Sequence, residues 1–238
     1  MEAQLKEFLD RLQPAAGSNL VSVVLYGSAA TGEFRAGQSD LNILCLVNHA
    51  DAKDLESLHD VSEWWIKKGN HPPLIFTREE LHRSADVFAI ELLDMKASHR
   101  ILYGPDFFTG LEVPLHLHRL QVERELRTNW LRLRQAIIAA PLTEKAHLAL
   151  MTNSLSTFCS LFRHAVFALG DKMPATKRDA ITAAAQLTNS DASTFHQLLD
   201  LREGKSSAKS LNVEPSLRSY LSFVESVTNE VDRLLESQ

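Results

Sequence analysis

Near the N-terminus, a glycine, a serine and an aspartate stand at a spacing that suits phosphate chemistry. Gly27 and Ser28 follow an apolar run, and Asp40 comes a dozen residues later. Glycine lets the backbone approach a ligand, and a helix that begins there presents free N–H groups with a partial positive charge. A carboxylate opposite such a turn can hold a hard cation such as Mg²⁺ against substrate phosphates. The three residues therefore predict a metal-assisted phosphate site.

Two strands must position these residues. The β-branched run at 20–26 predicts a strand that ends just before Gly27, and residues 41–47 predict a second strand with Asp40 at its start. Because residues two apart along a strand point to the same side, Asp40 and Asn42 should project together, while their apolar neighbours face the core. Acidic residues are disfavoured in strands, and Asp40 also stands at a suitable spacing from Gly27. Both observations favour a functional role for Asp40 over that of a simple turn residue.

This order of residues resembles the polymerase-β-type nucleotidyltransferase superfamily, most closely its small bacterial members such as the aminoglycoside nucleotidyltransferases. Gly27, Ser28, Asp40 and Asn42 carry the resemblance. It implies transfer of a nucleoside monophosphate from an NTP to a hydroxyl of a small-molecule or protein acceptor. ATP is the expected NTP, and Asp40 is expected to hold Mg²⁺. It also implies a second, helical domain that closes over the nucleotide, with the site in the cleft between the domains.

The sequence departs from the family pattern at the acids. The family usually has a second carboxylate where Asn42 stands, and often a third on the next strand, which we place at 74–77 and which contains no acid. Asparagine can bind Mg²⁺ through its carbonyl oxygen but brings no charge, so one well-held ion is the most that Asp40 and Asn42 can support. Two hypotheses stay open. One is a nucleotidyltransferase of weakened activity; the other is a catalytically inactive protein of this fold that binds nucleotide or a protein partner, regulatory or antitoxin-like.

Three further residues are candidates for the same site. Arg35 lies in the turn-rich loop before Asp40 and could contact a triphosphate, although an arginine on a surface loop explains it equally well. Glu79 and Glu80 could replace the missing acid. They follow Thr77 in a pattern typical of a capping box, so helix capping explains them better.

The rest of the chain predicts an α+β fold class, a nucleotidyltransferase-type mixed β-sheet with flanking helices, followed by an all-helical bundle domain. We place the boundary so that the domains span 1–112 and 113–238. Helical periodicity dominates after residue 114, with breaks at proline and glycine. The predicted helices cover residues 2–12, 54–68, 77–83, 84–98, 116–139, 143–169, 174–187, 192–202 and 215–235, and a fourth short strand covers 100–103.

Composition narrows the function classes. The net charge of −5 argues against general nucleic-acid binding, because affinity for phosphate backbones needs clustered Lys and Arg. The charged, amphipathic N-terminus does not resemble a signal peptide, and no apolar run approaches the roughly 20 residues of a membrane span. We therefore expect a cytoplasmic protein without membrane partners; a homo-oligomer is compatible with the sequence. Cys45 and Cys159 sit in apolar runs and are expected to be core residues.

Overall fold

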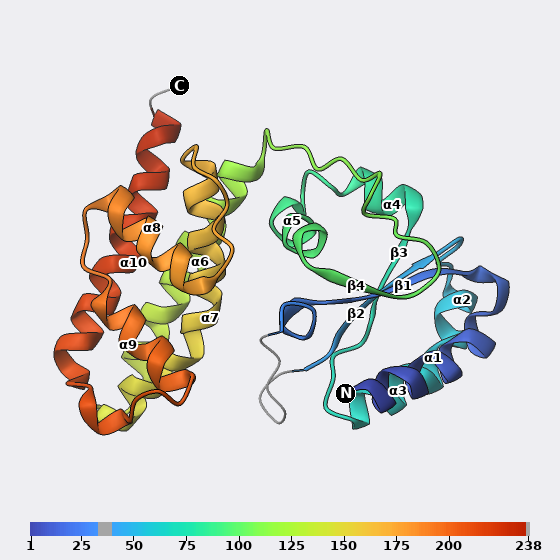
Figure 1. Ribbon diagram of the computed structural model, residues 1–238, viewed down its shortest axis with the longest axis horizontal. Coiled ribbons are helices and arrows are strands. Elements are labelled where there is room, and N and C mark those ends of the chain that lie inside the picture. The colour runs from blue at the N-terminus through green and yellow to red at the C-terminus, as the bar shows by residue number, and fades with distance from the viewer. Residues whose placement is uncertain (33–39, 237–238) are drawn as a thin grey trace. The chain divides into compact units, whose positions relative to one another are not determined.

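The computed structural model describes residues 1–32 and 40–236. The chain divides into two compact units, residues 1–115 and 116–238. The first unit is a sheet with helices on both faces, and the second is a bundle of helices (Figure 1). The α+β fold class predicted from the sequence is confirmed.

The sheet of the first unit is mixed. Its described strands are β1 (Leu20–Tyr26), β2 (Asn42–Val47), β3 (Leu74–Thr77) and β4 (His99–Tyr103), in the order β3-β2-β1-β4. β1 is antiparallel to β2 and to β4, whereas β2 and β3 are parallel. A parallel pair brings the beginnings of its two strands to the same edge of the sheet, which matters for the site below.

One face of the sheet is covered by α1 (Glu2–Ala16) and α3 (His59–Lys67), which are seen side by side in Figure 1. Their buried aromatic rings, Phe8 and Trp65, lie 4.6 Å apart between centroids and pack on the sheet. The helix predicted over 54–68 is in fact two helices. The first, α2 (Ala52–Ser57), starts earlier, at a capping box, and ends before Leu58, after which α3 begins. The helix predicted over 2–12 continues through Pro14 and ends at Ala16.

The other face is covered by α4 (Arg78–Arg83) and α5 (Ala89–Ala97). Leu81 and Leu92 from these helices pack on Val24 and Leu44 of the central strands. Both central strands are therefore buried on both faces, which explains why their sequences are almost continuously apolar.

The second unit consists of long helices around an aromatic core. Across its described part, residues 116–236, no strand is formed. Phe162 contacts Phe195 and Phe223 edge to face, and Tyr220 stacks on Phe195. None of the helices in the described ranges is long and apolar enough to cross a membrane. The helices are α6 (His118–Ala139), α7 (Glu144–Ala168), α8 (Lys177–Thr188), α9 (Ser193–Arg202) and α10 (Val213–Glu236), and short 3₁₀ turns occur at η1 (Gly17–Asn19), η2 (Gly27–Ala29) and η3 (Ala208–Ser210).

Candidate functional site

The turn after β1 is tighter than the sequence predicted. Gly27 has φ of 75° and begins the three-residue turn η2, in which the Ala30 N–H donates to the Gly27 carbonyl at 2.9 Å. The expected helix is thus, among the described residues, a single 3₁₀ turn. A phosphate at this turn would meet individual N–H groups and the Ser28 hydroxyl, without the summed dipole of a long helix. Arg35 lies outside the described residues, and its role stays a prediction.

Gly27 lies directly against Asn42. The two strands pair with Tyr26 opposite Asn42, and a Cβ built on Gly27 would come 3.1 Å from Asn42 Nδ2. Only a residue without a side chain fits this conformation and this distance easily. The structure therefore brings the Gly-Ser turn and the position of the missing acid together.

Asp40 precedes the strand that the sequence assigned to it. β2 begins at Asn42, two residues later, yet the expected alternation is kept, since Leu41 and Ile43 are both buried in the core beneath α1 and α3. Asp40 is partly exposed, with 34% of its side chain accessible. Burial, and secondly the Asp40 carboxylate, raise the pKa of Tyr26 to about 12. The Asp40 charge therefore acts on the same end of β1 as the Gly27 turn.

His71 is the residue of this region that sequence reasoning missed. Its Nε2 lies 3.1 Å from Asp40 Oδ2, and the neighbouring Asn70 accepts a hydrogen bond from the Leu41 N–H at 2.9 Å through Oδ1. The register of β2 against β3 accounts for the position of His71. Leu44 is opposite Leu74 in the parallel ladder, so counting back three residues on each strand places Leu41 beside His71.

The acids after β3 are engaged in helix capping, as the sequence predicted. Glu80 accepts hydrogen bonds from the Thr77 N–H at 2.8 Å and the Thr77 hydroxyl at 2.9 Å, while the Glu80 N–H donates to Thr77 Oγ1. The hydrogen bond from the Thr77 backbone, followed by that from its hydroxyl, lowers the pKa of Glu80. Glu79 pairs with Arg83 at 2.7 Å. Neither carboxylate replaces the acid missing at Asn42.

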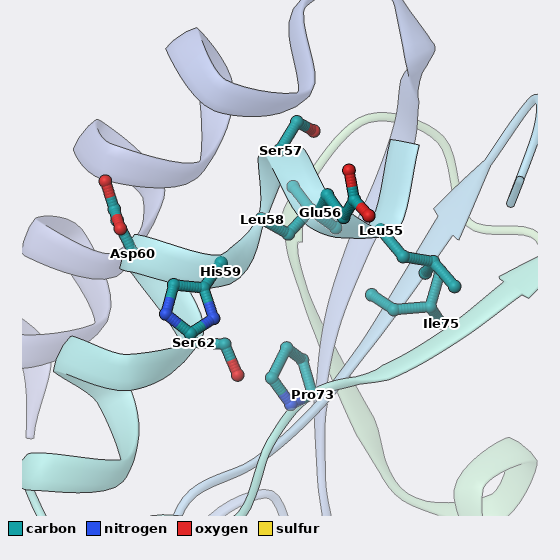
Figure 2. Close-up of a pocket in the computed structure, with 9 residues that line it drawn as sticks. All are labelled: Leu55, Glu56, Ser57, Leu58, His59, Asp60, Ser62, Pro73 and Ile75. Carbon is teal, nitrogen blue, oxygen red and sulfur yellow. The ribbon is translucent and has the colours of Figure 1, made fainter. Parts of the chain in front are cut away.

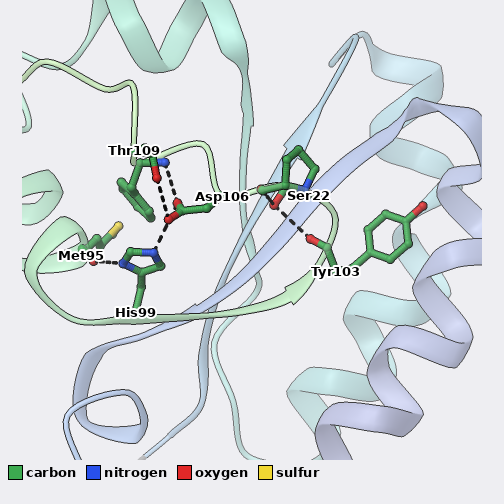
Figure 3. Close-up of polar contacts among 8 residues, drawn as sticks. Ser22, Met95, His99, Tyr103, Asp106 and Thr109 are labelled. Carbon is green, nitrogen blue, oxygen red and sulfur yellow. Dashed lines mark hydrogen bonds and ion pairs between the residues drawn. The ribbon is translucent and has the colours of Figure 1, made fainter.

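His99, on β4, lies opposite Tyr26 of β1, which in turn lies opposite Asn42 of β2. Its Nδ1 lies 2.9 Å from the Met95 carbonyl and its Nε2 lies 3.4 Å from Asp106 Oδ1 (Figure 3). Asp106 in turn accepts hydrogen bonds from the Phe108 N–H and the Thr109 hydroxyl. One ring nitrogen of His99 ties β4 to the preceding helix α5, and the other ties it to the following turn. These contacts describe a structural residue and not a general base.

Two grooves on the first unit lie away from these residues. One, of about 820 Å³, is lined by the junction of α2 and α3 and by Pro73 and Ile75 (Figure 2). The other, of about 880 Å³, lies where β2 and β3 end, beside Asn48 and Arg78. Neither is lined by Gly27 or Asp40, so neither groove describes the candidate site.

The donor set fits one divalent cation. Asp40 offers a carboxylate and Asn42 a carboxamide oxygen, which are the hard donors that Mg²⁺ accepts. In the ranges 1–32 and 40–236, no group of three or more His, Cys, Asp and Glu side chains is placed to hold a metal ion.

Comparison with known proteins identifies the first unit. Residues 2–97 match the family model described as nucleotidyltransferase domain. This segment, which contains Gly27, Ser28, Asp40 and Asn42, is a nucleotidyltransferase domain. No curated protein sequence matches the chain at a significant level.

A solved structure extends the likeness to the whole chain. A spectinomycin adenyltransferase from Enterococcus faecialis, crystallised with ATP and spectinomycin, is similar with a TM-score of 0.59 and 14% sequence identity. The match covers 98% of this chain and 99% of that one. At this identity the likeness shows the fold, which the two chains share across both the sheet and the helical part.

Proposed function

We propose that this protein binds an NTP, with ATP as the preferred nucleotide, and transfers its nucleoside monophosphate to a hydroxyl of an acceptor. Asn42 lowers this activity. The observation that carries the proposal is the juxtaposition of the Gly27 turn and Asn42, with Asp40 two residues before Asn42, inside a nucleotidyltransferase domain. This is the arrangement in which a phosphate turn and a cation ligand serve the same substrate.

The side chains divide the work between phosphate and cation. Gly27 and Ser28 would position the β- and γ-phosphates, and Asp40 would hold Mg²⁺ with Asn42 as a neutral ligand. When bound, the cation would supply neutralisation of the phosphate charge. Arg35 is a further predicted phosphate contact. Catalysis of such a reaction rests mainly on positioning and on charge stabilisation, so few residues need to react themselves.

The proposed transfer is a substitution at the α-phosphorus. The acceptor hydroxyl oxygen forms a bond to the α-phosphorus, and the bond from that phosphorus to the bridging oxygen of the β-phosphate breaks. The hydroxyl proton passes to a base or to solvent, and the electron pair leaves with pyrophosphate. The structurally similar enzyme was crystallised with ATP and spectinomycin. That supports ATP as the donor and a small molecule bearing hydroxyls as the acceptor; a protein hydroxyl is the other acceptor class.

A second candidate function is nucleotide or partner binding without turnover. It is favoured by Asn42 and by the absence of any acid from the sequence of β3, Leu74–Thr77. Removing a single preorganised charge-stabilising group commonly costs roughly 10²–10³ in rate, so the loss of two anionic ligands would cost several powers of ten. In its nucleotide-binding form, this candidate shares the binding site with the first and differs from it only in turnover.

Calorimetric titration tests the nucleotide binding that is needed by the first candidate and by the nucleotide-binding form of the second. ATP and the other NTPs are titrated into the protein with and without Mg²⁺, and into Asp40→Ala. The matched control is Asp10→Ala, which removes an exposed carboxylate from α1. Magnesium-dependent binding that survives Asp10→Ala and disappears in Asp40→Ala supports the site. Absence of binding for every NTP under both conditions contradicts it.

Product analysis separates the enzyme from the binding protein. Incubation with α-³²P-labelled ATP and a panel of aminoglycoside and aminocyclitol acceptors should yield labelled acceptor and pyrophosphate in equal amounts. Binding of ATP with no product above that of Asp40→Ala would favour the second candidate.

A further inference from the structure

The contact between Asp40 and His71 has no role in the chemistry proposed so far. Asp40 Oδ2 and His71 Nε2 are 3.1 Å apart, while 81% of the His71 side chain is exposed. Ion pairs between exposed side chains contribute about 0–1 kcal/mol. Stabilisation of the fold is therefore a weak explanation for an imidazole beside the one carboxylate that the family motif retains.

The segment that carries His71 is held in place from both sides. Asn70 is only 8% exposed, accepts the Leu41 N–H through Oδ1 and lies 3.5 Å from the Trp65 carbonyl through Nδ2. Pro72 follows His71, and a residue before proline is restricted to extended conformations. A buried amide and a stiff dipeptide thus fix the backbone on both sides of an exposed imidazole.

The spacing of the two donor atoms suits a shared cation. Metal–ligand bonds of about 2.1 Å at right angles place neighbouring donors about 3 Å apart. The 3.1 Å between Asp40 Oδ2 and His71 Nε2 agrees with this value, so one ion could accept both atoms with little movement of either side chain. Imidazole nitrogen is a good ligand for first-row transition metals, whereas Mg²⁺ prefers oxygen.

We propose that His71 is a ligand of the same ion as Asp40, and that the site therefore selects a divalent first-row transition metal, with Mn²⁺ as the probe, over Mg²⁺. This inference rests on the proposed function only in that Asp40 is the shared ligand. His71 supplies a donor from the segment that precedes β3, the strand whose sequence lacks an acid. It supplies no charge, so the ion keeps more of its positive charge for the triphosphate.

Manganese spectroscopy tests the ligand directly. Mn²⁺ alone is titrated into uniformly ¹⁵N-labelled protein, with bound ion followed by electron paramagnetic resonance and the nitrogen coupling by electron spin-echo modulation. The titration is repeated with unlabelled ATP, whose ¹⁴N atoms are distinguishable from ¹⁵N of the protein. The variants are His71→Gln and, as a matched control, His82→Gln, which alters an exposed histidine on α4. Circular dichroism verifies that each variant is folded.

The expected result is one bound Mn²⁺ with a ¹⁵N coupling of directly coordinated imidazole in the wild type and in His82→Gln. In His71→Gln the coupling disappears and Mn²⁺ affinity falls by about tenfold, while Mg²⁺ affinity changes by less than about twofold. Bound Mn²⁺ without ¹⁵N coupling, or equal Mn²⁺ affinity in His71→Gln, overturns the role of His71 and leaves magnesium-dependent ATP binding intact. Failure of the proposed function gives a different pattern, in which the wild type binds neither ATP nor either metal.

Discussion

The tripeptide Leu-Tyr-Gly occurs twice in the first unit, and its two copies differ in what surrounds the glycine. Residues 25–27 end β1 and residues 102–104 end β4. Because β1 and β4 are antiparallel, the copies lie at opposite ends of the sheet. Gly27 and Gly104 adopt nearly the same left-handed conformation, with φ of 75° and 73°. The local sequence and the local backbone are thus alike.

The two glycines differ in the atoms that surround them. A Cβ on Gly104 would come 2.1 Å from the Val21 carbonyl oxygen, which is backbone, while a Cβ on Gly27 would meet only the end of the Asn42 side chain at 3.1 Å. The turn after Gly104 is also closed by Ser22, whose hydroxyl lies 3.0 Å from the Tyr103 carbonyl and 2.8 Å from that of Pro105 (Figure 3). One glycine is closed in by backbone atoms of β1, and the other faces the side chain of Asn42 in the candidate site. The same tripeptide is therefore packed against backbone at one end of the sheet and against a polar side chain at the other.

Gly104→Ala should have the largest effect on stability. The left-handed conformation costs roughly 1–2 kcal/mol for a residue with a side chain, and relief of the overlap with the backbone of Val21 should add about 1–3 kcal/mol. We expect a loss of about 2–5 kcal/mol in the free energy of unfolding, measured by urea denaturation. Gly110→Ala is the matched control, since nothing lies within 4 Å of its added Cβ and its φ is not left-handed. Equal stability of the two variants would contradict the difference between the two turns.

Gly27→Ala should have a smaller effect on stability and a clear effect on nucleotide binding. We expect a loss of roughly 1–2 kcal/mol, mainly from the conformation, because the Asn42 amide can move away from the new methyl group. ATP affinity, measured by calorimetry, should fall because the methyl group occupies the face that the turn offers to phosphate.

The double variant Gly27→Ala/Asn42→Ala sharpens this test. Removal of the Asn42 amide takes away the 3.1 Å contact, so the double variant should be more stable than the sum of the single changes predicts. Strict additivity of the two changes would show that Asn42 does not limit the space at Gly27.

Asn42→Asp tests whether the asparagine weakens the cation site. A second carboxylate beside Asp40 adds an anionic ligand, so we expect Mg²⁺ affinity to rise by roughly tenfold, with the greater part of the gain abolished by Asp40→Ala. Without added metal, the like charges should lower the melting temperature slightly. Unchanged Mg²⁺ affinity, measured by calorimetry, would mean that residue 42 does not face the ion.

Local patterns predicted the elements better than the contacts between them. β-Branched and apolar runs gave β1 and β3 with both bounds correct. Helical periodicity gave each of the helices α6 to α10, in the described part of the second unit, to within a few residues. The spacing between the Gly-Ser pair and Asp40 predicted that Gly27 and Asn42 lie at the same end of the sheet, where the structure has them. His71 was missed because its contact with Asp40 depends on pairing of strands 30 residues apart, which no local pattern expresses.

A buried contact in the second unit shows the same limit. His118 Nε2 lies 3.0 Å from His164 Nδ1, in a pair buried between α6 and α7. Periodicity places each histidine on a helix, but it does not indicate which faces of two helices meet. The sequence therefore predicts amphipathic helices and leaves the polar partners inside the bundle to be found in the structure.

The tyrosines of the two tripeptides give the last and, at neutral pH, the smallest expected difference. Burial and then the Asp40 carboxylate raise the pKa of Tyr26 to about 12 from its ordinary value of 10.0. A group whose pKa is raised by folding stabilises the folded state below its unfolded pKa, and that contribution is lost as pH rises through the folded pKa. Wild type should therefore lose stability between about pH 10 and 12 more steeply than Tyr26→Phe, with a chelator present, as measured by urea denaturation. Tyr103→Phe, which changes the partly exposed tyrosine of the other tripeptide, is the control. Asp40→Asn should lower the pKa of Tyr26 in a ¹³C-tyrosine NMR titration; an unchanged pKa would show that burial acts on this tyrosine without help from the charge of Asp40.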